Sequence, residues 1–449
     1  MTKLLLTHAY FLHADAKEQQ VMKPYAPLGI LYLSSHLRAR GFDVEIYDST
    51  FGSREELFRI LRDGPPAALG IYANLMTRSN AIDAIAVARA AGWHVIVGGP
   101  EPSNYAEEYL DAGADVVVCG EAEIAVEQLM ATGFDPAAWP SVDGIVFRSA
   151  GGRVVRNNAA RTLSDLDAQP WPDRERIDIP RYMKTWRDHH GKSSISLITA
   201  RGCPYKCNWC SHSVYGHTHR RRSPGAVAEE VDWLLSRYQP DMLWIADDVF
   251  TIHHGWIFEY AAELKRRGIR IPFECITRAD RVNERIAETL KKLGCMRVWI
   301  GSESGSQRIL NAMERGVSVE QVRRAVGQCK ANGIETGMFL MWGYDGEDIS
   351  DIEATVDHLK QCRPDIFLTT VSYPIKGTPY FEKVTPRLVN VKPWASSSDR
   401  ELQIRGRHSR RFYKYADELL RSEMSPQRDE GSILAARSGL RETYEETEA

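Results

Sequence analysis

The sequence lacks the features that mark membrane-spanning, secreted or fibrous proteins. It has no window of about 18 uncharged apolar residues, so we expect no transmembrane segment. Its first twenty residues lack the apolar core of about 7–15 residues and the cleavage site of a signal peptide. Low-complexity stretches and collagen-like repeats are absent as well. We therefore expect a globular protein of the cytoplasm.

Excess charge and abundant cysteine are also missing. The 57 basic and 60 acidic residues give a net charge of −3, so we expect no nucleic-acid partner. Of the eight cysteines, three fall within residues 203–210, which in a reducing compartment favours a metal site over disulfides. The other five stand singly in apolar runs and are predicted to be small buried hydrophobic residues. These five are Cys119, Cys275, Cys295, Cys329 and Cys362.

The chain of 449 residues has room for about three domains of typical size. Over residues 1–140, five short runs that are apolar on both faces alternate with helix-like segments. Such runs are typical of strands in a buried parallel sheet, so we predict a doubly wound, Rossmann-like α/β domain. The predicted strands are 3–8, 44–48, 67–73, 94–98 and 115–119, and the predicted helices are 28–41, 53–63, 78–91, 104–112 and 123–132.

Residues 193–383 contain a second series of alternating strands and helices. Six strands predict a partial (β/α)6 barrel of the TIM type, whose chemistry is expected at the C-terminal strand ends. The predicted strands are 195–200, 242–246, 271–277, 296–301, 335–341 and 366–373, and the predicted helices are 225–238, 254–267, 282–293, 318–332 and 349–361.

Two further regions join and follow these domains. Residues 141–158 predict a β-hairpin, and we assign 141–192 as that hairpin plus an ordered linker. Residues 384–449 predict a helical C-terminal region, with a basic amphipathic helix over 400–424 and a frayed or disordered tail over 426–449.

The most informative string is RGCPYKCNWC, directly after the first strand of the barrel. It places Cys203, Cys207 and Cys210 in a C-x3-C-x2-C spacing. Three thiolates on one short loop can hold three corners of a [4Fe–4S] cluster, which leaves one iron without a protein ligand. That open position is the mark of a catalytic metal rather than a structural one.

A structural zinc ion is the alternative occupant of this loop. Zinc normally takes four ligands, and His212, His217 or His219 could supply the fourth. The chain would then be a non-catalytic metal-binding or sensor module.

The cysteine string, with Trp209 directly before its third cysteine, resembles the signature of radical S-adenosylmethionine (SAM) enzymes. The resemblance implies that SAM binds the free iron and that one electron, from a donor such as flavodoxin or ferredoxin, releases a 5′-deoxyadenosyl radical. Motifs at later strand ends occur in the order that the family shows. The SAM contacts that the resemblance implies are Tyr205, Trp209, Asp247, Asp248, Arg278, Gly301 and Glu303.

The first domain resembles the cobalamin-binding domain of one branch of this family, which includes the anaerobic magnesium-protoporphyrin ester cyclase and many methyltransferases. The motif D-x-H-x-x-G, whose histidine ligates cobalt in classical cobalamin domains, does not occur, and this branch commonly lacks it. Glu101 stands where the family often has histidine. The cobalamin contacts that the resemblance implies are Pro27, Leu28, Gly29, Asn74, Gly98, Gly99, Pro100, Glu101, Gly120 and Glu121.

The resemblance implies a substrate carbon radical that takes a methyl group from cobalamin, and hence methylation, or C–C bond formation, at an unactivated carbon of a small molecule. The alternative is a radical SAM cyclase, dehydratase or rearrangement enzyme, with or without cobalamin.

Several further residues allow two interpretations. Arg220, Arg221 and Arg222 form either a solvated loop with salt bridges or a contact for an anionic substrate or electron donor. Trp342 and Tyr344 belong to the barrel core or line a substrate pocket.

Overall fold

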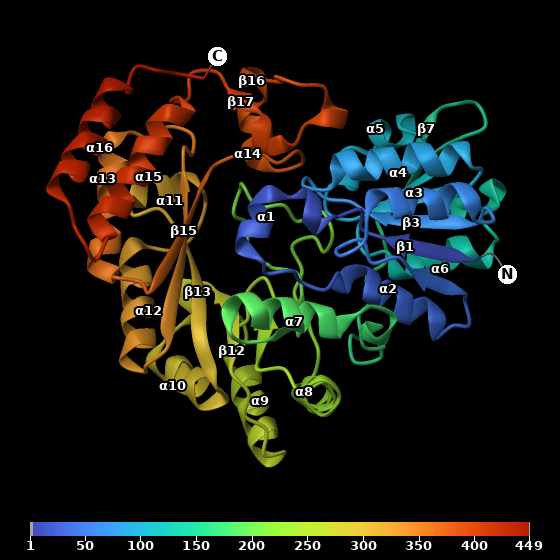
Figure 1. Ribbon diagram of the computed structural model, residues 1–449, viewed down its shortest axis with the longest axis horizontal. Helices are drawn as coiled ribbons and strands as arrows, with labels where there is room; N and C mark the ends of the chain where they lie inside the picture. Colours follow the sequence, from blue (N-terminus) through green and yellow to red (C-terminus); the bar gives the residue numbers. More distant parts are fainter. Residues whose placement is uncertain (1–2, 449) are drawn as a thin grey trace.

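The computed structural model describes residues 3–448 and has three parts (Figure 1). An N-terminal α/β domain stands beside a half-open barrel, and two C-terminal helices pack on the side of the barrel away from that domain. Within the described residues, no helix combines the length and the apolar character needed to cross a membrane.

The N-terminal domain is built on one seven-stranded sheet in the order β2-β1-β3-β4-β5-β6-β7. Strands β1 to β5 are parallel. As predicted, β1, β3, β4 and β5 are largely buried on both faces, whereas the edge strand β2 exposes Glu45. Leu5 packs with helices α3 to α5 on one face, whereas Leu4 and Leu6 pack with α2 and α6 on the other, which confirms the doubly wound fold. These elements are β1 (Leu4–Thr7), β2 (Val44–Ile46), β3 (Ala68–Tyr72), β4 (His94–Gly98), β5 (Val116–Val118), α2 (Leu28–Arg38), α3 (Arg54–Asp63), α4 (Arg78–Ala90), α5 (Ala106–Asp111) and α6 (Glu123–Ala131).

The predicted hairpin exists but belongs to this sheet. Its strands, β6 (Ile145–Arg148) and β7 (Val154–Arg156), extend the sheet antiparallel to β5. Ile145 and Val146 are 1% exposed and cover opposite faces of the sheet, so the hairpin completes the domain core. A domain end at residue 140, as predicted, would therefore leave β6 and β7 outside the domain whose sheet they complete.

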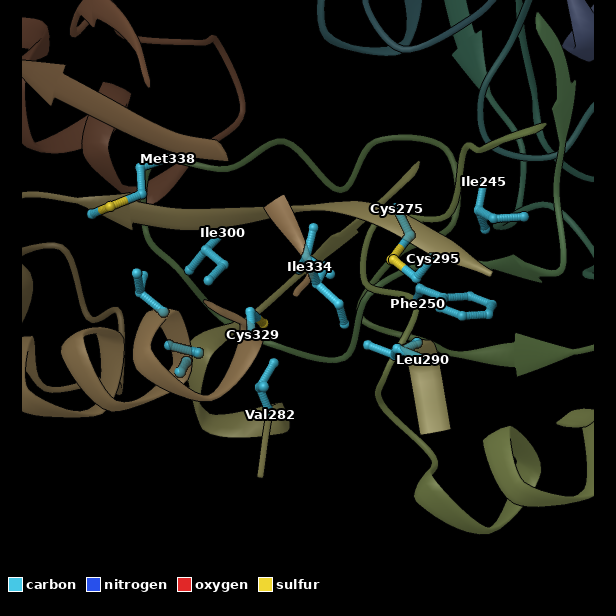
Figure 2. Packing of buried hydrophobic residues seen from close by; sticks show 14 of the residues in the cluster. Ile245, Phe250, Cys275, Val282, Leu290, Cys295, Ile300, Cys329, Ile334 and Met338 are labelled. Atoms are coloured by element: carbon cyan, nitrogen blue, oxygen red, sulfur yellow. The ribbon is translucent and has the colours of Figure 1, made fainter. Parts of the chain in front are cut away.

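The second sheet has six parallel strands in the order β15-β14-β13-β12-β11-β8, so each strand lies beside its predecessor and the barrel stays open. This order confirms the predicted partial barrel. Figure 2 shows the packing between this sheet and its helices, where Cys275, Cys295 and Cys329 are buried as predicted, as is Cys362 in the same cluster. The elements are β8 (Ser194–Leu197), β11 (Met242–Ile245), β12 (Phe273–Thr277), β13 (Cys295–Glu303), β14 (Glu335–Trp342), β15 (Ile366–Val371), α8 (Pro224–Tyr238), α9 (His254–Arg266), α10 (Glu284–Leu293), α12 (Val319–Ala331) and α13 (Ile349–Cys362).

The structure differs from four sequence-based expectations. The linker contains a helix of 12 residues, α7 (Ile179–His190). The basic C-terminal helix, α15 (Arg410–Met424), begins ten residues later than predicted. The tail predicted to be disordered forms α16 (Glu430–Glu442), which packs on α15 and buries three apolar side chains at helical spacing. Cys119, predicted to be buried, is half-buried beside Arg156 at the C-terminal end of β5.

Candidate active site between the two domains

A cavity of about 890 Å³ lies between the N-terminal sheet and the barrel sheet. Its walls include Leu6 and Gly70 of the N-terminal sheet and Ile276 and Phe339 of the barrel. Both sheets contribute the loops at their C-terminal strand ends, where ligands of such folds bind. The volume is that of a site for a ligand of drug size or larger.

The three clustered cysteines lie on a loop with a narrow neck. Strands β9 (Ala200–Arg201) and β10 (Arg220–Arg221) pair antiparallel and close the loop of residues 202–219, here called the cluster loop. Gly202 opens it with φ of +84°, and a Cβ there would lie 2.4 Å from the carbonyl oxygen of Thr218. Only glycine fits this turn without distortion.

All three cysteines of the cluster loop line the cavity as free thiols. Burial, together with the neighbouring thiols of Cys207 and Cys203, raises the pKa of Cys210 to about 12. The thiols of Cys207 and Cys203 therefore lie near enough to disfavour the thiolate form of Cys210. A bound cation would remove this penalty, so the donor set fits a metal cluster held by three thiolates.

The histidines proposed as a fourth zinc ligand do not converge with the cysteines on one point in the described residues. The ring centroids of His212 and His217 lie 4.1 Å apart. Nδ1 of His212 faces the carbonyl oxygen of Cys210, and Nδ1 of His217 faces that of Tyr205. His219 packs against His253, with ring centroids 5.0 Å apart. Among residues 3–448, no three Cys, His, Asp or Glu side chains converge on one metal ion. The geometry gives the zinc alternative no support, whereas a cubane needs no such convergence because each cysteine binds a different iron.

Six of the seven predicted SAM contacts line this cavity, and Asp247 does not. Asp247 is 2% exposed and accepts hydrogen bonds from the backbone nitrogens of Thr199 at 2.7 Å and Ala200 at 3.0 Å. Its other oxygen pairs with Arg221 at 3.0 Å. Asp247 thus holds the backbone of residues 199–200, which lead into the cluster loop, and does not face a ligand. The six that line the cavity are Tyr205, Trp209, Asp248, Arg278, Gly301 and Glu303.

Glu303 ends β13 in an unusual conformation. Its φ of +62° lies in the left-handed region, at a break in register between Gly301 and Glu303. The side chain is buried in the cavity wall, and burial raises the pKa of its carboxyl group above the ordinary value. A left-handed non-glycine residue at a strand end is typical of functional sites.

Arg315 was not predicted, although it lies at the centre of the site. It is 7% exposed, lines the cavity, and directs Nη1 to the sulfur of Cys207 at 3.4 Å. Nη1 of Arg278 points to the same sulfur at 3.7 Å. Arg315 lies outside every strand-end motif, in a turn after α11 (Gln307–Ala312), so the sequence offers no signal for it.

Nine of the ten predicted cobalamin contacts line the same cavity, and Glu101 does not. Gly99, at φ of +118°, brings its backbone so near β3 that a Cβ would lie 2.3 Å from the carbonyl oxygen of Ala73. A Cβ on Gly29 would meet nothing closer than 3.9 Å, so the bare backbone leaves room for a flat ligand. The nine are Pro27, Leu28, Gly29, Asn74, Gly98, Gly99, Pro100, Gly120 and Glu121.

Glu101 instead lies in a buried cluster behind the cavity. Its carboxylate pairs with Arg78, which also binds Asp399 at 2.7 Å. Burial raises the pKa of Glu101 to about 7. This carboxylate neutralises Arg78, which joins the N-terminal domain to the C-terminal segment, and it does not face the predicted cobalamin site.

The arginine run after the cysteines is not a solvated loop and offers no free cationic patch. Arg220 pairs with Glu121, Arg221 with Asp247, and Arg222 with Glu230. The side chains of Arg221 and Arg222 are each 5% exposed, so these are buried ion pairs.

Trp342 and Tyr344 belong to the core. Each is 1% exposed and neither lines the cavity. The hydroxyl of Tyr344 donates to Asn208 at 2.8 Å and so braces the cluster loop.

Comparisons with known proteins agree with this arrangement. Residues 197–359 match the radical SAM superfamily, and residues 20–130 match the B12 binding domain. The chain is 29% identical to an uncharacterized methyltransferase of Pyrococcus horikoshii over 79% of its own length and 78% of that protein. It is 25% identical to the anaerobic magnesium-protoporphyrin IX monomethyl ester cyclase of Rubrivivax gelatinosus, over 76% of its own length and 63% of that enzyme.

A solved structure shares the fold. The radical SAM methyltransferase TsrM of Kitasatospora setae, with cobalamin and a [4Fe–4S] cluster bound, superposes with a TM-score of 0.70 at 18% identity. The superposition covers 89% of this chain and 80% of that one.

Proposed function

Because the chain belongs to the radical SAM superfamily and carries a B12 binding domain, we propose that it is a cobalamin-dependent radical SAM enzyme that methylates an unactivated carbon of a small-molecule substrate. The observation that carries the proposal is the shared cavity. Three free thiols on one loop and the glycine-rich strand ends of the second domain line the same space.

The residues that would hold each group follow from this lining. Cys203, Cys207 and Cys210 would ligate the cluster, and the loops at Gly29, Gly99 and Gly120 would hold cobalamin. When bound, the cluster, SAM and cobalamin supply a 5′-deoxyadenosyl radical and a methyl group. The protein's own task is to keep the reacting atoms together and to exclude water.

The charged residues at the cavity wall suit the parts of SAM. Asp248 and Glu303 are carboxylates that can meet its cationic amine, and Arg278 or Arg315 can meet its carboxylate. Gly301 lines the same wall, and its missing side chain leaves space for Arg315 and Glu303, since a Cβ there would lie 2.6 Å from Nη2 of Arg315 and 2.8 Å from Oε1 of Glu303.

Three ion pairs between the N-terminal domain and the neck of the cluster loop hold the domains in register around these groups. Glu121 of the N-terminal domain pairs with both neck residues of the cluster loop, Arg201 at 3.4 Å and Arg220. Glu123 pairs with Arg201 at 2.7 Å. We infer that this network fixes the distance between the cobalamin loops and the cluster loop.

The test is anaerobic purification of the full chain with cobalamin supplied, followed by reconstitution with iron and sulfide. We expect an iron–sulfur absorption band, bound cobalamin, and release of 5′-deoxyadenosine from SAM under reducing conditions. The C203A, C207A and C210A variants should lose the band and the cleavage, because each removes one of three ligands. C275A is the matched control, since Cys275 is buried in the barrel core away from the cavity. Retained cleavage in the three variants would refute the assignment.

Labelled SAM separates methyl transfer from the related chemistries. With SAM labelled in its methyl group, methylation requires the label in the product, whereas a cyclase, dehydratase or rearrangement enzyme leaves the product unlabelled. The partners that we propose are a small-molecule substrate and a low-potential one-electron donor such as flavodoxin or ferredoxin.

A further inference from the structure

Two buried guanidinium groups converge on one cluster ligand. We propose that Arg278 and Arg315 set the reduction potential of the cluster through hydrogen bonds to the sulfur of Cys207. This inference rests on the proposed function, since it assumes that Cys207 ligates an iron–sulfur cluster.

The contacts single out one of the three cysteines. Arg315 donates through Nη1 at 3.4 Å and Arg278 through Nη1 at 3.7 Å, both within hydrogen-bonding range of sulfur. Cys207 is 7% exposed, whereas Cys203 and Cys210 are half-buried. Among residues 3–448, no arginine or lysine donates to the sulfur of Cys203 or Cys210.

Other contacts hold Arg278 in this direction. Its guanidinium lies 3.6 Å from the ring centroid of Tyr205, and Nε donates to Asp280 at 3.0 Å. Its second terminal nitrogen, Nη2, donates to the carbonyl oxygen of Arg315 at 3.0 Å. The nitrogen aimed at the sulfur therefore cannot turn away without breaking three other interactions.

Arg315 is held in the same manner but is less well neutralised. Nη2 donates to the carbonyl oxygen of Gly301 at 3.0 Å, and the nearest carboxylate, that of Glu303, lies 3.7 Å away. The Nε atom is buried without a partner. A permanently charged group placed so deep needs an anion, and a cluster thiolate at Cys207 would provide it.

The expected effect on the cluster follows from electrostatics. Reduction adds one electron and makes the cluster more negative. Nearby positive charge and N–H donors to a ligand sulfur stabilise that state more than the oxidised one, and therefore raise the potential. Removing either arginine should make the cluster harder to reduce and a stronger reductant once reduced.

The experiment is an anaerobic redox titration of the reconstituted full chain without SAM, followed by electron paramagnetic resonance. Iron and sulfide per chain are measured on the same samples. We expect R315Q and R278Q to keep the cluster and to lower its one-electron reduction equilibrium constant about tenfold, which corresponds to about 59 mV. The double variant should shift further.

R281Q is the matched control. Arg281 bonds to Tyr205 and lies 3.5 Å from Asp280, but it has no contact with a cluster sulfur in the described residues. The cluster of R281Q should therefore have the reduction potential of the wild-type cluster. The proposal would be overturned if R315Q and R278Q kept the cluster and showed the wild-type reduction potential. It would also be overturned if R281Q shifted the reduction potential by the same amount as R315Q and R278Q.

A lysine variant keeps the test decisive if the glutamine variants lose the cluster. R315K retains the charge but loses the fixed fork of donors, so we expect a smaller downward shift, and an unchanged potential would count against the inference. A wild-type chain that forms no cluster would refute the proposed function itself. A wild-type cluster with unshifted variants would refute only the role of the arginines.

Discussion

At the scale of single residues, Asp247 and Asp248 are chain neighbours with different surroundings. Asp247 is bound on all sides by backbone nitrogens and Arg221, whereas Asp248 opens onto the cavity. We expect D247N to cost about 3 kcal/mol of stability, because Arg221 would remain buried without its carboxylate partner. D248N should leave stability within about 0.5 kcal/mol of the wild type, yet weaken SAM binding.

Thermal unfolding and equilibrium binding of SAM under anaerobic conditions check this pair. The two variants differ by one position and carry the same change, so each is the control for the other. Equal effects on stability would show that the cavity-facing carboxylate has a structural role instead.

Glu347 gives a prediction about pH. It is 4% exposed, the backbone nitrogen of Gly343 donates to one of its oxygens, and its Oε1 atom has no partner. Burial raises its pKa to about 8, so the folded chain holds a proton that the unfolded chain releases at lower pH. Stability should therefore fall as pH rises towards 8, by at most about 1.4 kcal/mol per pH unit.

E347Q mimics the protonated form and should lose this slope. We expect the variant and the wild type to have similar melting temperatures near pH 5 and the variant to be more stable above pH 8. Because burial also raises the pKa of Glu101, the difference between the two proteins, not the wild-type curve alone, is the quantity to measure. Parallel curves would contradict the assignment.

At the scale of secondary structure, burial decided what could be predicted from the sequence. Strand β4 begins and ends at the predicted residues, because an apolar run buried on both faces has a clear pattern. Helix α16 was missed because its polar composition dominates the tail. Its buried residues Ile433, Ala436 and Leu440 nevertheless recur at helical spacing, so periodicity carried the signal that composition concealed.

For the site, too, the sequence predicts local features but not contacts between distant parts of the chain. The cysteine spacing and the glycine-rich strand ends are local features, and most of the residues that they identify line the cavity. Glu101 and Arg315 depend on partners elsewhere in the chain. Glu101 faces Arg78, which reaches Asp399 more than 300 positions away, and Arg315 meets Cys207 across the barrel. Periodicity and motif spacing contain no information about such tertiary pairs.

At the scale of the whole molecule, Arg78 fastens the N-terminal domain to the C-terminal segment. Its side chain is 2% exposed and binds Asp399 at 2.7 Å and the carbonyl oxygen of Ser397 at 2.9 Å, while Tyr105 donates to Asp399 at 2.7 Å. We expect R78M to cost about 3–5 kcal/mol, because it leaves Glu101 and Asp399 buried without a cation. R54M is the control, since Arg54 forms an exposed pair with Asp83.

The two cofactor sites should respond differently to R78M. The cobalamin loops lie on the domain that Arg78 fastens, so loosening it should lower cobalamin affinity. The neck of the cluster loop is held by Glu121 through Arg201 and Arg220 and is closed by its own strand pair, so iron and sulfide content should stay at the wild-type level. Cobalamin retention in anaerobic dialysis and iron content per chain measure the two effects. Parallel loss of both groups would show that the domains form one cooperative unit, in which the cluster loop has no stability of its own.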